Sequence, residues 1–133
     1  MSLTELFKEN FIDISLDTEQ SILIVDWKGY QSVSSVQQGC ERMLYMMSKH
    51  DAHRILNDNT KVLGIWIGAA EWLADNWFPR MAKSGMQRFA WVYSPARFSQ
   101  FSTDGTLALL DSEDYGIQTF HNRADALAWL ATP

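Results

Sequence analysis

The sequence predicts an α/β fold: a mixed, mostly parallel five-stranded sheet with an antiparallel edge strand, covered by four helices. Residues 10–17 and 21–27 read as two strands so close along the chain that they can only pair as an antiparallel hairpin. Helical and strand-like patterns then alternate three times before a last helix. This alternation requires crossover connections, and therefore parallel strands with helices packed on them. No repeat or linker divides residues 1–133, so we expect a single domain.

The five expected strands follow two patterns. Residues 10–17 alternate apolar and polar side chains, which is typical of a half-buried strand. The segment 21–27 is denser in β-branched residues, which indicates a more buried strand. Three short, mainly apolar runs provide the remaining strands, at residues 54–58, 88–93 and 116–120.

The first expected helix has the clearest periodic pattern in the chain. Its apolar face is formed by Val33, Val36, Cys40, Met43, Leu44 and Met47. Either Ser32 caps this helix, or Ser34 does so in a capping box with Gln37. Gly39 weakens the helix unless a neighbouring group packs closely against it. Cys40 lies in the apolar face, so we expect it to be a small buried residue.

The second expected helix covers residues 68–85 and places Leu73, Trp77 and Met81 on one face. Pro79 should kink or split this helix, because proline lacks the N–H that a helix needs and its ring clashes with the preceding turn. Gly85 is placed to end it.

Two further helices begin at recognisable caps. Ser94 with Pro95 is a good helix start, and Gly105 is expected to end or bend the helix that follows. Asn122 is expected to cap the last helix, over residues 122–131.

Composition excludes several classes of function. The net charge of −5 gives no attraction to phosphate backbones or anionic lipid, so we expect no nucleic-acid partner. No apolar run reaches membrane-spanning length and no signal peptide is visible, so we expect no membrane insertion and a cytoplasmic location. One cysteine cannot form an internal disulfide, which suits a reducing compartment. No cofactor-binding motif appears, and we expect no cofactor.

The polar run Asn57–Thr60 is the first candidate site. Short polar side chains hold turns by bonding neighbouring backbone groups, so we expect a turn here. The alternative is a binding role for Asp58, Asn59 and Thr60. In a parallel sheet the loops at the carboxyl ends of the strands meet ligands and partners, and this run is expected there together with Gly29–Ser32 and Ser94–Arg97.

Aromatic residues after this run form the second candidate. Trp66 falls in an expected loop and Trp72 lies partly off the apolar face of its helix. Together with Phe78 they would form an exposed surface for a partner or for self-association. The alternative is that all three simply pack in the interior.

Two weaker candidates complete the set. Ser94 and Arg97, at a helix start, could hold an anion, because backbone N–H groups are free there and a cation opposes the helix dipole. His50 and His53 could share a metal only if one helix held them. They fall instead where a helix gives way to a strand, and no third ligand supports them, so no metal site is predicted.

Several segments resemble the small bacterial SpoIIAA-like families, relatives of the STAS domain. The resemblance rests on "VDWKG", "ILND", "AAEWLADNWFPRMAKSGMQRFAWV" and "GIQTFHNRADALAWL", and covers nearly the whole chain. It implies the α/β fold described above and, in STAS-type antagonists, a serine or threonine whose phosphorylation controls docking of a kinase-like partner. Here the corresponding turn, "GIWIGAAEW", contains no serine, and Thr60 is the one hydroxyl between residues 56 and 70. The chain therefore departs from the phosphoswitch pattern.

These observations favour a non-enzymatic, cytoplasmic domain that binds a protein partner or a second copy of itself, as a homodimer, through residues 60–78. The alternative is a carrier or sensor of a small apolar or amphiphilic ligand, with Phe98 and Phe101 lining its pocket. A third, weaker alternative is an enzyme that uses Asp58 as a base.

Overall fold

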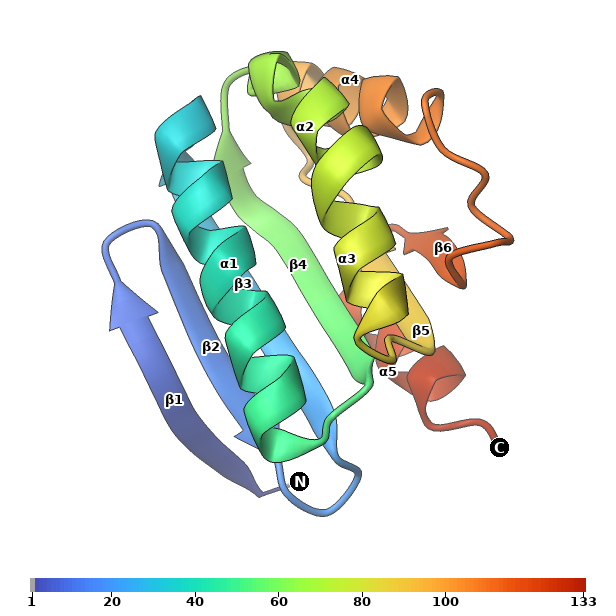
Figure 1. Cartoon of the computed structure of the whole chain (residues 1–133). Helices are drawn as coiled ribbons and strands as arrows, with labels where there is room; N and C mark the ends of the chain where they lie inside the picture. Colours follow the sequence, from blue (N-terminus) through green and yellow to red (C-terminus); the bar gives the residue numbers. More distant parts are fainter. Residues whose placement is uncertain (1) are drawn as a thin grey trace.

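The computed structural model describes residues 2–133, which form one six-stranded sheet with the strands in sequence order (Figure 1). β1 (Leu3–Glu9), β2 (Ile12–Asp17) and β3 (Ile22–Tyr30) are antiparallel neighbours. β3, β4 (Arg54–Leu63), β5 (Arg88–Val92) and β6 (Ile117–Phe120) are parallel. The predicted α/β class, with a mostly parallel sheet and an antiparallel edge, is confirmed, with six strands in place of five.

β1 is the strand that the sequence pattern did not reveal. It lies at the edge of the sheet, and most of its side chains are exposed or only partly buried. An edge strand with so little burial carries no continuous apolar run, so it does not stand out from the charged residues around it.

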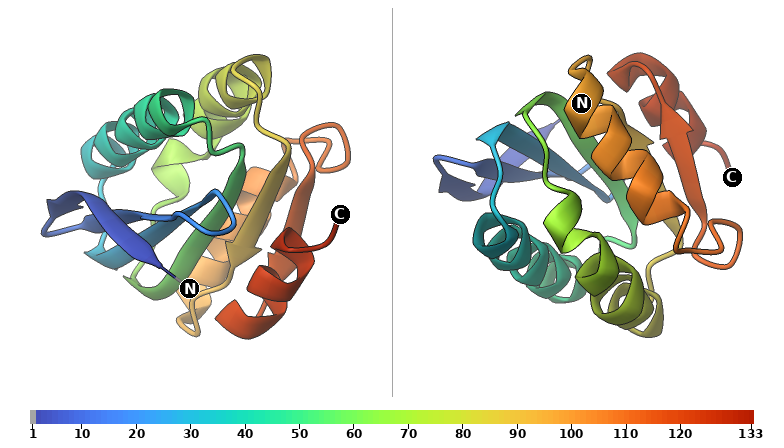
Figure 2. Two further views of the ribbon diagram at one scale, coloured as in Figure 1. Left: turned by 90° about the horizontal axis from the view of Figure 1, so that it is seen from below. Right: turned by 90° about the horizontal axis from the view of Figure 1, so that it is seen from above.

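The helices cover the two faces of the sheet unequally. α1 (Val33–His50) and the helical segment 67–83 lie side by side on one face, and α5 (Arg123–Leu130) lies on the other (Figure 1). α4 (Arg97–Leu107) crosses the carboxyl end of the parallel strands, as the view from above shows (Figure 2). The larger core lies under α1 and the segment 67–83, and a smaller one lies under α5.

α1 forms as its sequence predicts. Ser32 is its N-cap, because the Ser32 hydroxyl accepts from the Ser35 N–H and the Ser35 hydroxyl accepts from the Ser32 N–H. Ser34, the other proposed cap, lies inside the helix. Gly39 allows a close approach, since a Cβ atom there would lie 2.4 Å from a ring carbon of Trp27.

The segment after β4 is interrupted as Pro79 predicts. It comprises a 3-10 turn Ile67–Ala69, α2 (Ala70–Trp72), a π-helical turn Leu73–Trp77 and α3 (Phe78–Lys83). In the π turn the Phe78 N–H reaches the Leu73 carbonyl, five residues back. The extra residue in this turn is how the helix accommodates a proline that cannot donate. It also leaves the consecutive residues Trp77 and Phe78 both buried.

Two local predictions are wrong. α4 begins after Ala96 and not at Ser94, and it continues through Gly105, which leaves room for the Ile67 side chain. Ser94 is drawn into the interior instead, where its hydroxyl donates to the Val62 carbonyl at 2.7 Å. The Asn122 cap of α5 is confirmed, because the Asn122 side chain accepts from the Asp125 N–H.

The predicted turn at Asn57–Thr60 is also wrong, since β4 runs through it to Leu63. Three of its polar residues are buried, and two of them, Asn57 and Asp58, also bond to residues far away in the chain, Trp27 and Arg123. β4 also contains a bulge, since Asp26 pairs with Asp58 but Lys28 pairs with Lys61. The prediction of a turn was wrong because it relied only on the polar composition of Asn57–Thr60.

Within residues 2–133, none of the helices has both the length and the apolar character needed to cross a bilayer.

Candidate functional site

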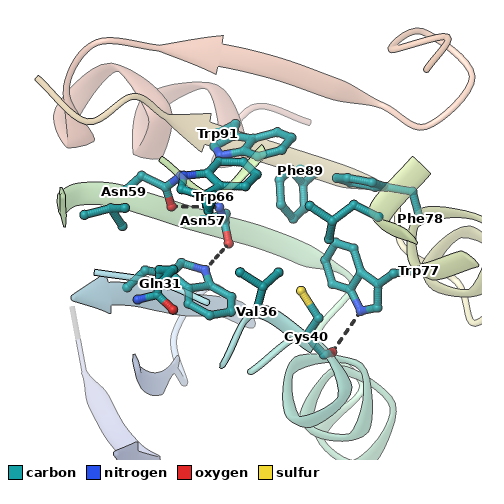
Figure 3. A pocket seen from close by; sticks show the side chains of 13 residues that line it. Gln31, Val36, Cys40, Asn57, Asn59, Trp66, Trp77, Phe78, Phe89 and Trp91 are labelled. Carbon is teal, nitrogen blue, oxygen red and sulfur yellow. Dashed lines mark hydrogen bonds between the residues drawn. The ribbon is translucent and has the colours of Figure 1, made fainter. Parts of the chain in front are cut away.

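A half-enclosed cavity lies under α1 and the segment 67–83, toward the carboxyl end of β3, β4 and β5 (Figure 3). Its volume available to the centres of water molecules is about 30 Å³, enough for roughly two or three waters. The lining is mainly aromatic and carries no formally charged side chain: Trp27, Gln31, Val36, Cys40, Asn57, Asn59, Val62, Trp66, Leu73, Trp77, Phe78, Phe89 and Trp91.

β4 supplies three lining residues because of its bulge. Asn57 and Asn59 are two residues apart, so a regular strand places them on the same face. Val62 lies an odd number of residues after Asn59 and would face the other way in a regular strand. The extra residue in the bulge restores it to the cavity side.

The polar groups gather at one end of the cavity. The Trp27 Nε1–H donates to Asn57 Oδ1 at 2.8 Å, and Asn57 Nδ2 donates to Asn59 Oδ1 at a long 3.4 Å. Figure 3 shows both asparagines at the end opposite to Trp77 and Phe78. The cavity therefore has an amide end and an aromatic end.

One polar group at this cavity has no partner. Trp91 lies beside Asn57 on the neighbouring strand and is 3% exposed. Its Nε1–H is buried and has no hydrogen-bond acceptor within residues 2–133. A buried donor without an acceptor costs about 1–3 kcal/mol, so this group is suited to receive an acceptor from outside the chain.

The remaining indoles are held by hydrogen bonds. Trp66 donates two hydrogen bonds, from its backbone N–H to Ser102 Oγ at 2.9 Å and from its Nε1–H to Ser99 Oγ at 3.2 Å. The Trp77 Nε1–H donates to the Cys40 carbonyl at 2.8 Å. Burial, followed by the nearby Glu41 charge, raises the pKa of the Cys40 thiol, which therefore stays protonated. The expectation of a buried Cys40 is confirmed.

The opposite face of the sheet carries charged groups at the same level. Asp58 Oδ1 accepts from the Thr60 N–H at 2.8 Å and from the Thr60 hydroxyl, and Asp58 Oδ2 accepts from Arg123 Nε at 2.9 Å. Asp26 pairs with Lys61 at 3.1 Å and lies 3.8 Å from Arg123. These residues line an open groove with His121 and Asn122.

The structure separates the predicted site residues. Asp58 and Asn59 point to opposite faces, and Thr60 is exposed. Trp66 and Phe78 are buried and Trp72 is partly buried, so these residues pack in the interior, as the alternative stated above, and the exposed surface does not form.

The other predicted positions are also displaced from where the sequence suggested. Phe98 and Phe101 are 64% and 56% exposed and do not line the cavity. Ser94 is buried with its hydroxyl engaged, whereas Arg97 is exposed, so they form no common anion site. The misprediction at Ser94 and Arg97 follows from the later start of α4.

Exposed apolar side chains do gather, but at another place. At the carboxyl end of the sheet we define an apolar rim of Tyr30, Val33, Leu63, Ile65 and Phe98. Their exposed fractions run from 45% for Val33 to 77% for Tyr30. The rim was missed because its members come from β3, α1, β4, the following loop and α4, and no single segment carries a pattern.

Within residues 2–133, no three His, Cys, Asp or Glu side chains lie close enough together to hold a metal ion. Comparison with models of known protein families finds no match for this chain, and comparison with curated proteins finds none either.

Proposed function

We propose that this chain is a non-enzymatic binding domain that associates with a second copy of itself through the apolar rim. The observation that carries the proposal is the exposure of Tyr30, at 77%, beside other exposed apolar side chains. Exposed apolar groups that gather in one place mark interaction surfaces, and aromatic residues are enriched at them.

Two members of the rim are direct neighbours in the sheet. Tyr30 and Leu63 pair across β3 and β4, and the Tyr30 ring lies against Gly64. Val33 Cγ2 lies 3.3 Å from the position that a Cβ atom of Gly68 would take. The Tyr30–Leu63 pair, with Val33 three residues after Tyr30 along the chain, supports one patch formed by the ends of β3 and β4 and the start of α1.

Phe98 extends the patch from α4. Ser102 accepts from the Trp66 N–H and donates to the Phe98 carbonyl at 3.0 Å, which holds this helix against the loop after β4. Phe98 lies one turn before Ser102 on the same side of α4. This placement supports including Phe98 in the rim together with Ile65, the residue before Trp66.

A second copy suits this patch better than a partner selected by charge. The rim consists of uncharged side chains, so it offers no net charge of one sign with which to select another protein. In a two-fold symmetric contact the same patch meets itself, and apolar groups are complementary to apolar groups. The net charge of −5 opposes association only weakly at physiological salt.

The side chains best suited to catalysis are either already hydrogen-bonded or buried, which supports a role in binding. Both oxygens of Asp58 already accept hydrogen bonds, from Thr60 and Arg123. The Cys40 thiol is buried and protonated. A general base needs a free lone pair within reach of substrate, and a nucleophile needs exposure.

A cytoplasmic location and membership of the SpoIIAA-like families are part of the same proposal. The one cysteine is unpaired, which supports a reducing compartment such as the cytoplasm. Membership of the SpoIIAA-like families rests on the sequence motifs given above. The parallel sheet with helices on its faces agrees with it but is shared by many families.

Sedimentation analysis over a range of concentrations tests the proposal. We expect a monomer–dimer equilibrium for the wild type, and at least a tenfold weaker association for Tyr30→Ser and Phe98→Ser. Tyr45→Ser is the matched control, because Tyr45 is 51% exposed on α1 and lies outside the rim. A wild type that stays monomeric at all concentrations, or a dimer weakened by Tyr45→Ser alone, would contradict the proposal.

A further inference from the structure

We propose that the tryptophan-lined cavity binds a small, neutral, planar ligand whose hydrogen-bond acceptor pairs with the Trp91 Nε1–H. This ligand site is separate from the apolar rim and does not depend on dimerisation. Four features of the cavity define the ligand: its uncharged lining, its unpaired donor, its flat walls and its single partly exposed lining residue.

The lining requires a neutral ligand. None of the side chains around the cavity is a carboxylate or a cation, and the Cys40 thiol is protonated. An ion placed there would lose its hydration with no opposite charge in return, which is strongly unfavourable. The aromatic end, with Trp77, Phe78 and Phe89, offers an apolar body favourable contact instead.

The unpaired donor requires an acceptor. Trp27 and Trp77 each donate from Nε1 to a protein oxygen, and Trp66 donates to Ser99. Trp91 is the one indole lining the cavity whose buried Nε1–H lacks a partner within residues 2–133. In Figure 3 its nitrogen lies at the end of the ring toward Asn59. A carbonyl or ring nitrogen of the ligand at this end would satisfy it.

Flat walls favour a planar ligand. The rings of Trp66 and Trp91 lie nearly parallel, with an interplanar angle of 19° and centroids 6.2 Å apart. Aromatic rings pack well against such surfaces in offset arrangements. A single aromatic or heteroaromatic ring therefore fits the walls better than a flexible acyl chain.

Gln31 marks the entrance. It is the one lining residue that is not buried, and its side-chain Nε2–H donates to the Phe11 and Lys28 carbonyls. The free volume of about 30 Å³ is too small for a complete aromatic ring. Binding therefore requires Gln31 to swing outward and the cavity to expand.

Three matched probes test the inference on the wild-type protein. Acetophenone has a neutral ring and a carbonyl acceptor, ethylbenzene has a similar shape without the acceptor, and benzoate carries a charge. We follow the indole N–H resonances by ¹H–¹⁵N NMR. Acetophenone is expected to shift the Trp91 resonance and to bind about tenfold more tightly than ethylbenzene, the equivalent of one hydrogen bond. Benzoate is expected not to bind.

Trp91→Phe removes the donor but also enlarges the cavity, which affects both probes, so the quantity compared is the ratio of their affinities. The preference for acetophenone over ethylbenzene should fall about tenfold in Trp91→Phe and should be unchanged in Trp129→Phe, on the opposite face. If Trp91→Phe fails to fold, the titration of the wild-type protein still tests the inference. Equal binding of acetophenone and ethylbenzene would overturn the inference. It would also be overturned if no probe shifted the Trp91 resonance and a long-lived water were detected beside it.

Discussion

The two faces of β4 bury polar side chains in different ways. Toward α1, Asn57 and Asn59 are neutral amides, and Asn57 accepts from a buried indole. Toward α5, the intervening Asp58 is a carboxylate whose oxygens accept from Thr60 and Arg123. All three residues are at most 4% exposed. One strand thus carries neutral polar groups on one face and an ion pair on the other.

The difference shows what each face can tolerate. The cavity side is closed by two helices and aromatic rings, where an unpaired charge would be costly. The α5 side is narrower and partly open, so the Arg123 side chain is 41% exposed and keeps contact with water while it pairs with Asp58. Neutral amides suit the first environment and a charged pair suits the second.

The largest expected effect is on the free energy of unfolding, and it should differ between the two cores. Phe78→Ala removes a fully buried ring under the helices and should lower the free energy of unfolding by about 3–5 kcal/mol. Phe120→Ala, on the α5 side, removes a partly exposed ring and should cost clearly less. Urea unfolding followed by circular dichroism measures both. An equal or larger loss for Phe120→Ala would show that the two cores do not differ as described.

Added salt should change the stability losses of variants at Asn57 and Asp58 to different extents. Asn57→Ala leaves the Trp27 Nε1–H without an acceptor, and Asp58→Ala leaves Arg123 and Thr60 without one. We expect each to cost about 1–3 kcal/mol at low salt. The Asp58→Ala loss should shrink as salt is added, because a partly exposed pair is screened, whereas the Asn57→Ala loss should not.

Urea unfolding at low and high sodium chloride measures this difference. Asp58→Asn provides a variant of nearly the same size, in which the charge alone is removed. If the Asn57→Ala loss depended on salt as strongly as the Asp58→Ala loss, the contrast between a neutral face and a charged face would be wrong.

The smallest expected effect concerns Thr60. Thr60→Val keeps the shape and the backbone N–H but removes the hydroxyl that donates to Asp58, and should cost about 0.5–1.5 kcal/mol. Thr4→Val on the exposed edge strand β1 is the matched control, expected within about 0.5 kcal/mol of the wild type. Similar unfolding curves for the two variants would show that the Thr60 hydroxyl adds nothing to the charged face.

Periodic patterns predicted most of the fold. The spacing of Val36, Cys40, Met43 and Met47 located α1 and its buried face, and Pro79 located the interruption of the next helix. Hairpin proximity and the alternation that follows predicted the mixed sheet. These features succeed because they depend on local periodicity, which a sequence shows directly.

The candidate site was much harder to predict. Asn57–Thr60 has the composition of a turn, and its strand structure depends on partners 30 and 65 residues away, Trp27 and Arg123. The bulge that brings Val62 to the cavity has no local pattern. The burial of Phe78 depends on the π turn, which shifts the helix by one residue. Long-range hydrogen bonds and local irregularities of this kind cannot be inferred from hydrophobic periodicity.

α5 has a consequence for the order in which the chain acquires its structure during synthesis. Among residues 2–133, it supplies the helical residues that cover Ile24, Leu56 and Val92. It is synthesised after all six strands, since translation runs from the N-terminus. β1 to β5 can therefore pair while this apolar surface is still open to water. For that interval the nascent sheet is exposed to chaperones and to aggregation, and the closing helix ends both at once.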